Sequence, residues 1–230
     1  MLQREKMAAL GQMAAGVVHE INNPLASLDS HVQLLERQPQ RLGPDALATI
    51  RQQLNRIQSI VQRMTEFAHP GGKMADRVAV NDLAHHVAEI ARFDPRCKRA
   101  ALTLNLDPHA GHVHVCRQAL EQVMLNLLLN AFDALDGTPD PRVELSTGVR
   151  DGWPFLAVAD NGPGIDDPTK ARLFEPFFTT KPIGKGVGLG LSISYSLVSS
   201  LGGKIEVQSA PGRGARFSVL LPADSPAQPA

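Results

Sequence analysis

The sequence predicts a helical hairpin that dimerises into a four-helix bundle, followed by an α + α/β sandwich with helices on one face of a mixed or antiparallel sheet. Apolar residues recur every seven positions in the first part of the chain, whereas extended and helical patterns alternate from about residue 76 onward. A chain of 230 residues has room for both parts. We expect the hairpin over residues 1–70, a linker over 71–75 and the sandwich over 76–222.

The first helix carries an apolar stripe that is wider than a two-stranded coiled coil needs. Its main series, spaced by seven residues, is Met7, Ala14, Ile21, Leu28 and Leu35. Leu10 and Val17 occupy the intermediate positions of the heptad. Val18, Leu25 and Val32 widen the stripe on one side. This is the a, d and e face of a helix that belongs to a bundle.

A second amphipathic helix follows a break rich in turn-forming residues, from Gln38-Pro39 to Gly43-Pro44. We expect this helix to run from Asp45 to Ala68. Its stripe comprises Leu47, Ile50, Leu54, Ile57, Val61, Met64 and Ala68. Two helices with faces this broad cannot bury both faces against each other, whereas two hairpins can, so we predict a homodimer.

The elements of the second domain are predicted from the change between helical and extended patterns. We expect helices from a cap at Asn81-Asp82 to about Phe93, from Arg117 to Leu135, and from about Leu189 to Leu201. We expect strands over Ala101–Leu106, Val143–Val149, Phe155–Ala159, Lys204–Gln208 and Ala215–Leu220. The Asp151-Gly152 turn should join the two central strands as a hairpin. Residues 223–230 should form a disordered tail.

The composition excludes several classes of protein. Lys plus Arg and Asp plus Glu both number 23, and aromatic residues make up 4%, so neither charge nor base stacking favours nucleic acid as a partner. No apolar run approaches the roughly 18 residues that span a bilayer, and no signal peptide is apparent. Cys97 and Cys116 are interpreted as reduced thiols. We therefore expect a cytoplasmic chain without a membrane segment.

His19 is a candidate nucleophile because it lies at the f position of the heptad, opposite the apolar stripe. A lone exposed histidine is usually only solvated. Here the adjacent Glu20 can take or orient one ring proton while the other ring nitrogen attacks an electrophile.

Asn23 lies one helical turn beyond His19 on the same exposed face. Its amide can hold a water in line with an aspartyl phosphate docked near His19. Pro24 strains the next turn, which predicts a bendable helix with two geometries. The alternative is a kink that only shapes the bundle.

A polar ridge on the long helix is a candidate binding surface. Asn126, Asn130 and Asp133 stand at i, i+4 and i+7 on a helix that is otherwise apolar, within Met-Leu-Asn-Leu-Leu-Leu-Asn-Ala. Buried amides need partners, and a metal ion with a triphosphate would supply them.

Two glycine-rich segments are candidate parts of a nucleotide site. Asp160-Asn161-Gly162-Pro163-Gly164-Ile165 follows a strand directly, so Asp160 can accept a hydrogen bond from a base amine while the glycines admit the ring. Residues 184–191 (Gly-Lys-Gly-Val-Gly-Leu-Gly-Leu) precede a helix, whose free N–H groups can bind phosphate. Each segment alone is also explained by an ordinary turn.

Taken together, these segments resemble the sensor histidine kinases, over about residues 7–221, in the form typical of nitrogen-regulation-like kinases. The resemblance rests on motifs that follow one another in the family's order. The phosphoacceptor box is His19 to Leu25, the N box is Asn126 to Asn130, and the first glycine box is Asp160 to Gly164. The F box is Leu173 to Phe178, extended by Thr179-Thr180-Lys181, the second glycine box is Gly186 to Gly190, and the closing motif is Gly212 to Ala215. Ordered boxes at these spacings are highly specific, although any one alone is not.

The resemblance implies a Bergerat (GHKL) α+β domain that binds ATP and Mg²⁺. In that family's scheme Asn130 coordinates Mg²⁺, Asn126 supports the phosphates, and Asp160 binds the adenine amine. Residues 166–187 would form a lid. The remaining expected ATP contacts are Asp133, Gly162, Gly164, Ile165, Phe174, Thr180, Lys181, Gly186, Val187, Gly188, Leu189 and Gly190. Val187 replaces the family's usual threonine, which removes a hydroxyl near the phosphates.

The resemblance further implies autophosphorylation of His19 and transfer to an aspartate of a response regulator, and the placement of Asn23 predicts phosphatase activity as well. One alternative is a GHKL-type ATPase of the gyrase or chaperone kind. Such enzymes place a glutamate four residues before the metal asparagine, where this chain has Asn126. The other alternative is a degenerate scaffold module, which predicts damaged boxes. An upstream sensor domain or partner is expected outside this chain, and no motif specifies the signal or the regulator.

Overall fold

The computed structural model describes residues 21–38, 43–68, 75–181 and 188–224. The chain divides into two compact units, Met1–His69 with Thr179–Leu189, and Pro70–Phe178 with Gly190–Ala230. Among the described residues, no helix is both long and apolar enough to cross a bilayer.

The described part of the first unit is helical where the sequence predicts it, and residues 1–20 of the predicted first helix lie outside the described residues. One helix covers residues 21–37, and α2 covers Pro44–Ala68. Pro44 begins α2 at a position where the missing N–H costs nothing, since the first N–H groups of a helix have no intrahelical partner. Residues 39–42 of the predicted break lie outside the described residues.

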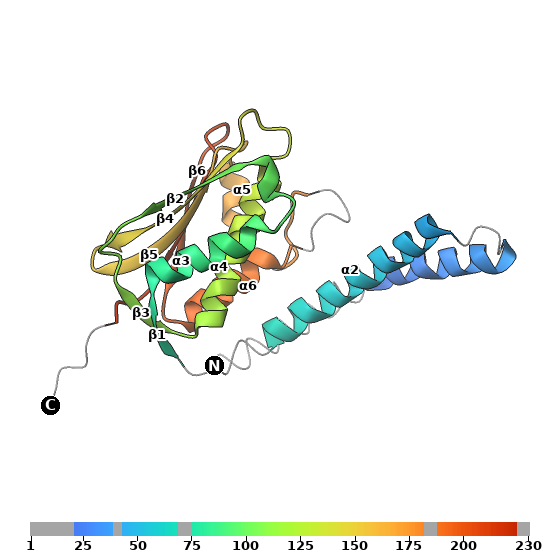
Figure 1. The fold of residues 1–230 in the computed structure, drawn as a ribbon, viewed down its shortest axis with the longest axis horizontal. Helices are drawn as coiled ribbons and strands as arrows, with labels where there is room; N and C mark the ends of the chain where they lie inside the picture. Colours follow the sequence, from blue (N-terminus) through green and yellow to red (C-terminus); the bar gives the residue numbers. More distant parts are fainter. Residues whose placement is uncertain (1–20, 39–42, 69–74, 182–187, 225–230) are drawn as a thin grey trace. The chain divides into compact units, whose positions relative to one another are not determined.

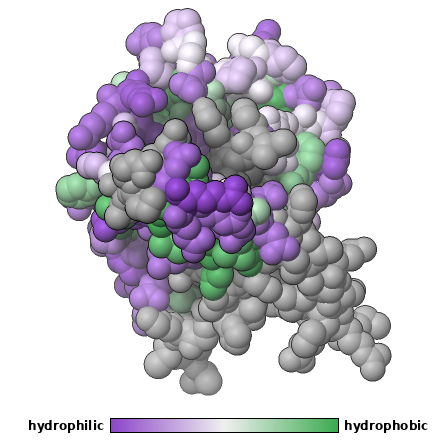
Figure 2. Space-filling model, turned by 90° about the vertical axis from the view of Figure 1, so that its right-hand side faces the viewer, coloured by the Kyte–Doolittle hydropathy of each residue, from purple (hydrophilic) through white to green (hydrophobic). Residues whose placement is uncertain are grey.

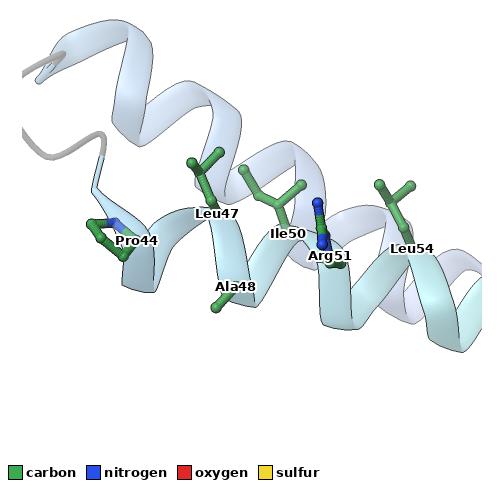
Figure 3. Close-up of a pocket in the computed structure, with 6 residues that line it drawn as sticks. All are labelled: Pro44, Leu47, Ala48, Ile50, Arg51 and Leu54. Atoms are coloured by element: carbon green, nitrogen blue, oxygen red, sulfur yellow. The ribbon is translucent and has the colours of Figure 1, made fainter.

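Large apolar side chains on both helices remain exposed at the heptad spacing of the predicted stripe. Leu25 and Val32 are 45% and 44% exposed, and Leu47, Leu54 and Val61 are 55%, 49% and 47% exposed. Along α2, an open groove is lined by Pro44, Leu47, Ala48, Ile50, Arg51 and Leu54, and Figure 3 shows Leu47, Ile50 and Leu54 projecting from the same side of the helix. One hairpin therefore leaves part of its apolar face uncovered.

The second unit is an α+β sandwich built on a mixed five-stranded sheet. Its elements are β1 (Asp76–Ala79), α3 (Val80–Arg92), the 3₁₀ helix η2 (Cys97–Arg99), β2 (Ala101–Leu106), β3 (His112–Val115), α4 (Arg117–Ala134), β4 (Arg142–Arg150), β5 (Trp153–Asp160), α5 (Asp167–Arg172), α6 (Gly190–Ser200), β6 (Lys204–Ser209) and β7 (Ala215–Leu220). The predicted strands and the three longer helices are confirmed, within a residue or two at their ends.

The strand order of the large sheet is β2-β4-β5-β7-β6, with β2 and β4 parallel and the other pairs antiparallel. The α4 helix lies in the crossover between the two parallel strands, and α3, α4 and α6 cover one face of the sheet (Figure 1). The core lies in this layer. Leu145 and Val158, which face each other across β4 and β5, are 0% and 1% exposed, as is usual for the covered face of such a sheet.

The predicted hairpin between β4 and β5 is confirmed. Arg150 pairs with Trp153, and the two residues between them have φ values of 51° (Asp151) and 79° (Gly152). Positive φ at both central positions is the signature of a type I′ turn, which matches the twist of the flanking strands.

The prediction that Asn81 or Asp82 caps α3 is wrong. The helix begins at Val80 with Ala79 as its N-cap, and the side chain of Ala79 makes no cap hydrogen bond. Asn81 instead donates to the Asp107 carbonyl at 2.8 Å and accepts from the Thr147 hydroxyl at 2.6 Å. Because the Asn81 side-chain amide links the end of β2 to β4 through these two hydrogen bonds, it does not cap α3.

The prediction of a disordered tail from residue 223 is also wrong for its first two residues. Ala223 forms a β-bridge with Val113, and the Asp224 N–H donates to the His112 carbonyl at 3.0 Å. Asp224 also forms an ion pair with Arg77 at 2.9 Å. The short antiparallel pair of β1 and β3, which was not predicted, provides the partner that orders these residues.

On the face shown in Figure 2, hydrophilic side chains cover most of the described surface, and hydrophobic side chains form small separate groups.

Candidate active site

Asp160, the last residue of β5, is the best-defined member of the candidate site. Its Oδ1 accepts hydrogen bonds from the Gly162 N–H at 2.9 Å and from the Ala215 N–H at 3.3 Å. Burial raises the pKa of this carboxyl above its ordinary value, and the two N–H bonds only partly offset that effect. The result is a fixed, partly desolvated hydrogen-bond acceptor at the end of a central strand.

Two glycines allow the segment that follows Asp160 to pack closely against the turn between β6 and β7. Gly164 and Gly214 have φ values of 72° and 67°, and a Cβ on either residue would collide with a backbone carbonyl oxygen, that of Ala210 or of Asp160 respectively. The Gly214 N–H donates to the Gly162 carbonyl at 3.1 Å. The first glycine box and the closing motif are therefore one interlocked structure, although about 50 residues separate them in sequence.

Ser209 connects this structure to the segment that follows it. Its hydroxyl donates to the Gly214 carbonyl at 2.6 Å and accepts from the Ile165 N–H at 2.8 Å. Its carbonyl accepts from the Lys170 ammonium at 2.9 Å, which fixes the short helix α5. Ser209 was not predicted as part of the site, since a lone serine at a strand end carries no sequence signal.

Asn126 lies where α4 meets the start of α6. Its Nδ2 donates to the buried Ser194 hydroxyl at 2.8 Å. A Cβ on Gly190 would meet the end of the Asn126 side chain, which would have to shift to make room for it. The structure thus brings the N box next to the last glycine of the second glycine box.

Asn130 and Asp133 continue the ridge along α4, and both side chains are partly buried. Asp133 Oδ1 accepts from Arg96 Nη1 at 2.9 Å. Arg96 was not predicted as part of the site. A carboxylate on the ridge is therefore paired with a cation from the loop that follows α3.

The F box packs against α6 through its first aromatic residue. The ring centroids of Phe174 and Tyr195 are 5.0 Å apart. The Arg172 guanidinium lies 4.4 Å from the centroid of the Phe178 ring and bonds Glu175 at 2.9 Å. Phe177, between these contacts, has a φ of 66°, which is uncommon for a bulky residue.

Several predicted site residues are not placed against Asp160 and Asn130. His19, Glu20, Gly186 and Val187 lie outside the described residues. Asn23 is exposed on the helix over residues 21–37. Thr180, Lys181, Gly188 and Leu189 belong to the first unit.

The described residues contain no cluster of three or more His, Cys, Asp or Glu side chains suited to a metal ion. Mg²⁺ commonly takes one or two protein oxygen ligands and completes its shell with phosphate oxygens and water. An amide oxygen such as that of Asn130, partly buried on the ridge, fits this mode of binding.

Comparison with known protein families agrees with this arrangement. Residues 116–225 match the family described as histidine kinase-, DNA gyrase B- and HSP90-like ATPase. Residues 9–72 match the His Kinase A (phospho-acceptor) domain. The class defined by fold and site is therefore a Bergerat-type ATP-binding domain that follows a phosphoacceptor hairpin.

The chain is similar to the signal transduction histidine-protein kinase AtoS of Escherichia coli (32% identical over 223 residues, 96% of this chain and 36% of AtoS). It is also similar to the C4-dicarboxylate transport sensor protein DctB of Rhizobium meliloti (35% identical over 225 residues, 96% of this chain and 36% of DctB). A solved structure of full-length ShkA with AMPPNP superposes with a TM-score of 0.66 at 27% identity, over 95% of this chain and 47% of ShkA. The chain belongs to the sensor histidine kinases, and it spans about a third of the length of the two curated relatives.

The burial of Asp160 leads to a prediction about the ligand-free protein. A carboxyl whose folded-state pKa lies above its ordinary value of 3.8 favours folding below pH 3.8, and this contribution is lost as the pH rises through the folded-state pKa. Asp160→Asn retains an Oδ1 acceptor and has no charge to bury. We expect its urea midpoint to exceed that of the wild type at pH 7, with the gain vanishing below pH 3.8.

The matched control is Asp136→Asn, an exposed residue, which should change the midpoint little at either pH. A lower midpoint for Asp160→Asn than for the wild type at pH 7 would contradict the account of the burial.

Proposed function

We propose that this chain is the catalytic core of a sensor histidine kinase, which uses ATP and Mg²⁺ to phosphorylate His19 and passes the phosphoryl group to an aspartate of a response regulator. The observation that carries the proposal is the geometry around Asp160. A desolvated acceptor held by two backbone N–H groups, with glycines that keep side chains away, suits the exocyclic amine of adenine. The family match of the hairpin supports His19 as the acceptor.

The chemistry assigned to the chain is positioning and charge neutralisation, which dominate phosphoryl transfer. Asp160 would orient the adenine, Asn126 would support the phosphates, and Asn130 would hold Mg²⁺, which neutralises charge on the phosphates. An Nε2 or Nδ1 lone pair of neutral His19 forms the N–P bond as the bond from the γ-phosphorus to the bridging oxygen of ADP breaks. Glu20 takes the proton from the other ring nitrogen.

A hydrolytic ATPase is the weaker candidate. The position four residues before Asn130 carries Asn126, whose amide donates to Ser194 and cannot serve as a base for water. A degenerate scaffold module is weaker still. Gly164 and Gly214 each have a positive φ and a backbone carbonyl oxygen where a Cβ would lie, which is the pattern of an intact site.

The same proposal includes a homodimer formed by the hairpins. The exposed apolar residues recur at intervals of seven within each helix, Leu25 and Val32 in one and Leu47, Leu54 and Val61 in the other, which is the spacing of faces that a second hairpin can cover. The receiver domain of a response regulator is the proposed substrate, the cytoplasm the proposed location, and a sensor domain or partner protein the proposed source of the signal.

Autophosphorylation is tested with full-length chain, Mg²⁺ and [γ-³²P]ATP. We expect label that is labile in acid and stable in base, because a phosphoramidate behaves in this way. His19→Gln should lose the label and still bind ATP, whereas Asn130→Asp should lose Mg-ATP binding while remaining folded. Equal labelling of wild type and His19→Gln would contradict the assignment of the acceptor.

A phosphatase activity is the second part of the proposal, and Asn23 is its candidate residue. Asn23 is exposed on the helix over residues 21–37, and the helix continues through Pro24. An exposed amide one turn from His19 could hold a water in line with an aspartyl phosphate. A proline in a helix weakens the local hydrogen bonding, which would allow two geometries of this turn.

Asn23→Ala should leave autophosphorylation within a few-fold of the wild type and largely abolish dephosphorylation of the phosphorylated regulator. The measurement is the loss of label from purified phosphoregulator with ADP present. If both activities fell together, the segment would only shape the helix. If dephosphorylation persisted, Asn23 would have no such role.

A further inference from the structure

Arg96, in the loop between α3 and β2, bridges two carboxylates. Its Nε and Nη2 donate to the two oxygens of Asp94 at 2.9 and 2.8 Å, and its backbone N–H donates to Asp94 Oδ1 at 2.9 Å. Its Nη1, on the other edge of the guanidinium, donates to Asp133 Oδ1 at 2.9 Å. Asp94 therefore holds Arg96 in the orientation in which it meets Asp133.

The hydrogen bonds between Asp94 and Arg96 shift the pKa values of both side chains. The hydrogen bonds from Arg96 lower the pKa of Asp94 to about 2, and the Asp94 carboxylate raises the pKa of Arg96 above its ordinary value. The guanidinium stays charged throughout the physiological range in any case. Arg96 is thus a permanent cation fixed against the Asp133 carboxylate.

The ion pair of Arg96 and Asp133 lies next to the part of α4 that is proposed to meet the nucleotide. Asp133 is three residues after Asn130, and side chains at i and i+3 of a helix are neighbours, with Cβ atoms about 5–6 Å apart. Asn130 is the residue proposed to meet Mg²⁺ and the triphosphate. A triphosphate stays net negative with one Mg²⁺ bound, so a negative carboxylate on this part of the ridge would repel it unless a cation balances the carboxylate.

We propose that Arg96 is a positioning residue of the nucleotide site, which neutralises Asp133 so that the ridge of α4 accepts a polyphosphate. This inference rests on the proposed function, because it assigns the triphosphate to the ridge. Asp133 then acts through its ion pair with Arg96 and is not itself a ligand of the phosphates.

The test is calorimetric binding of ATP, ADP and adenosine, with Mg²⁺, to the full chain and its variants. For Arg96→Gln we expect ATP binding weaker by about twofold to thirtyfold, the range for a unit charge about 8 Å away between the dielectric of water and that of a protein surface. The loss should be smaller for ADP and absent for adenosine, and it should shrink at high salt.

Three further variants separate charge from structure. Adding Asp133→Asn to Arg96→Gln should restore ATP affinity, because the repelling charge is gone. Arg96→Lys should remain close to the wild type, since it keeps the cation. Arg99→Gln, which removes an exposed arginine of the same loop, controls for the change in net charge and should have little effect.

An equal loss of affinity for adenosine and ATP in Arg96→Gln would overturn the inference, because it would mean a general distortion of the site. So would a double variant that stays as weak as Arg96→Gln, which would point to a direct contact of Arg96 with phosphate. If the wild type itself failed to bind ATP, the proposed function would fall, and that outcome is distinct from the other two.

Discussion

The nucleotide site proposed for this chain depends on one arrangement, the Asp160 carboxylate held by the N–H groups of Gly162 and Ala215. The carboxylate belongs to the last residue of the central strand β5, and the turn between β6 and β7 packs against the backbone of that residue. Gly214 makes this closure possible because any side chain there would meet the Asp160 carbonyl. The acceptor is consequently built from two segments distant in sequence, and its orientation is fixed before any ligand arrives. Such preorganisation lowers the cost of ordering a bound ligand.

The sequence predicted most of the fold because the long elements have strong periodicity. The heptads of the hairpin, the Asp151-Gly152 turn and the helix from Arg117 all carry local signals. The strands β1 and β3 were missed because each has four residues, too few for a periodic pattern. Asn81 was misassigned as a cap because the same residue type suits a helix start and a buried hydrogen-bond network.

The candidate site was predictable to the extent that its residues share short motifs. Asp160, Asn126 and Gly190 were found in this way, and the structure places Asn126 against Gly190. Ser209, Ser194 and Arg96 were not found, since their roles arise from contacts with residues 5 to 68 positions away. No short sequence pattern predicts contacts between residues so far apart in the chain. Asp133 was predicted as a nucleotide contact, and its ion pair with Arg96 suggests a different, supporting role.

The central claim, that Asp160 selects adenine through its exocyclic amine, is tested most directly by comparing ATP with ITP, which carries a carbonyl oxygen in place of that amine. Calorimetry on the wild type should show ATP bound at least about tenfold more tightly, because two facing acceptors repel and leave a buried group unpaired. Asp160→Asn, whose amide can donate, should lose most of this preference. Equal affinities for ATP and ITP in the wild type would contradict the account.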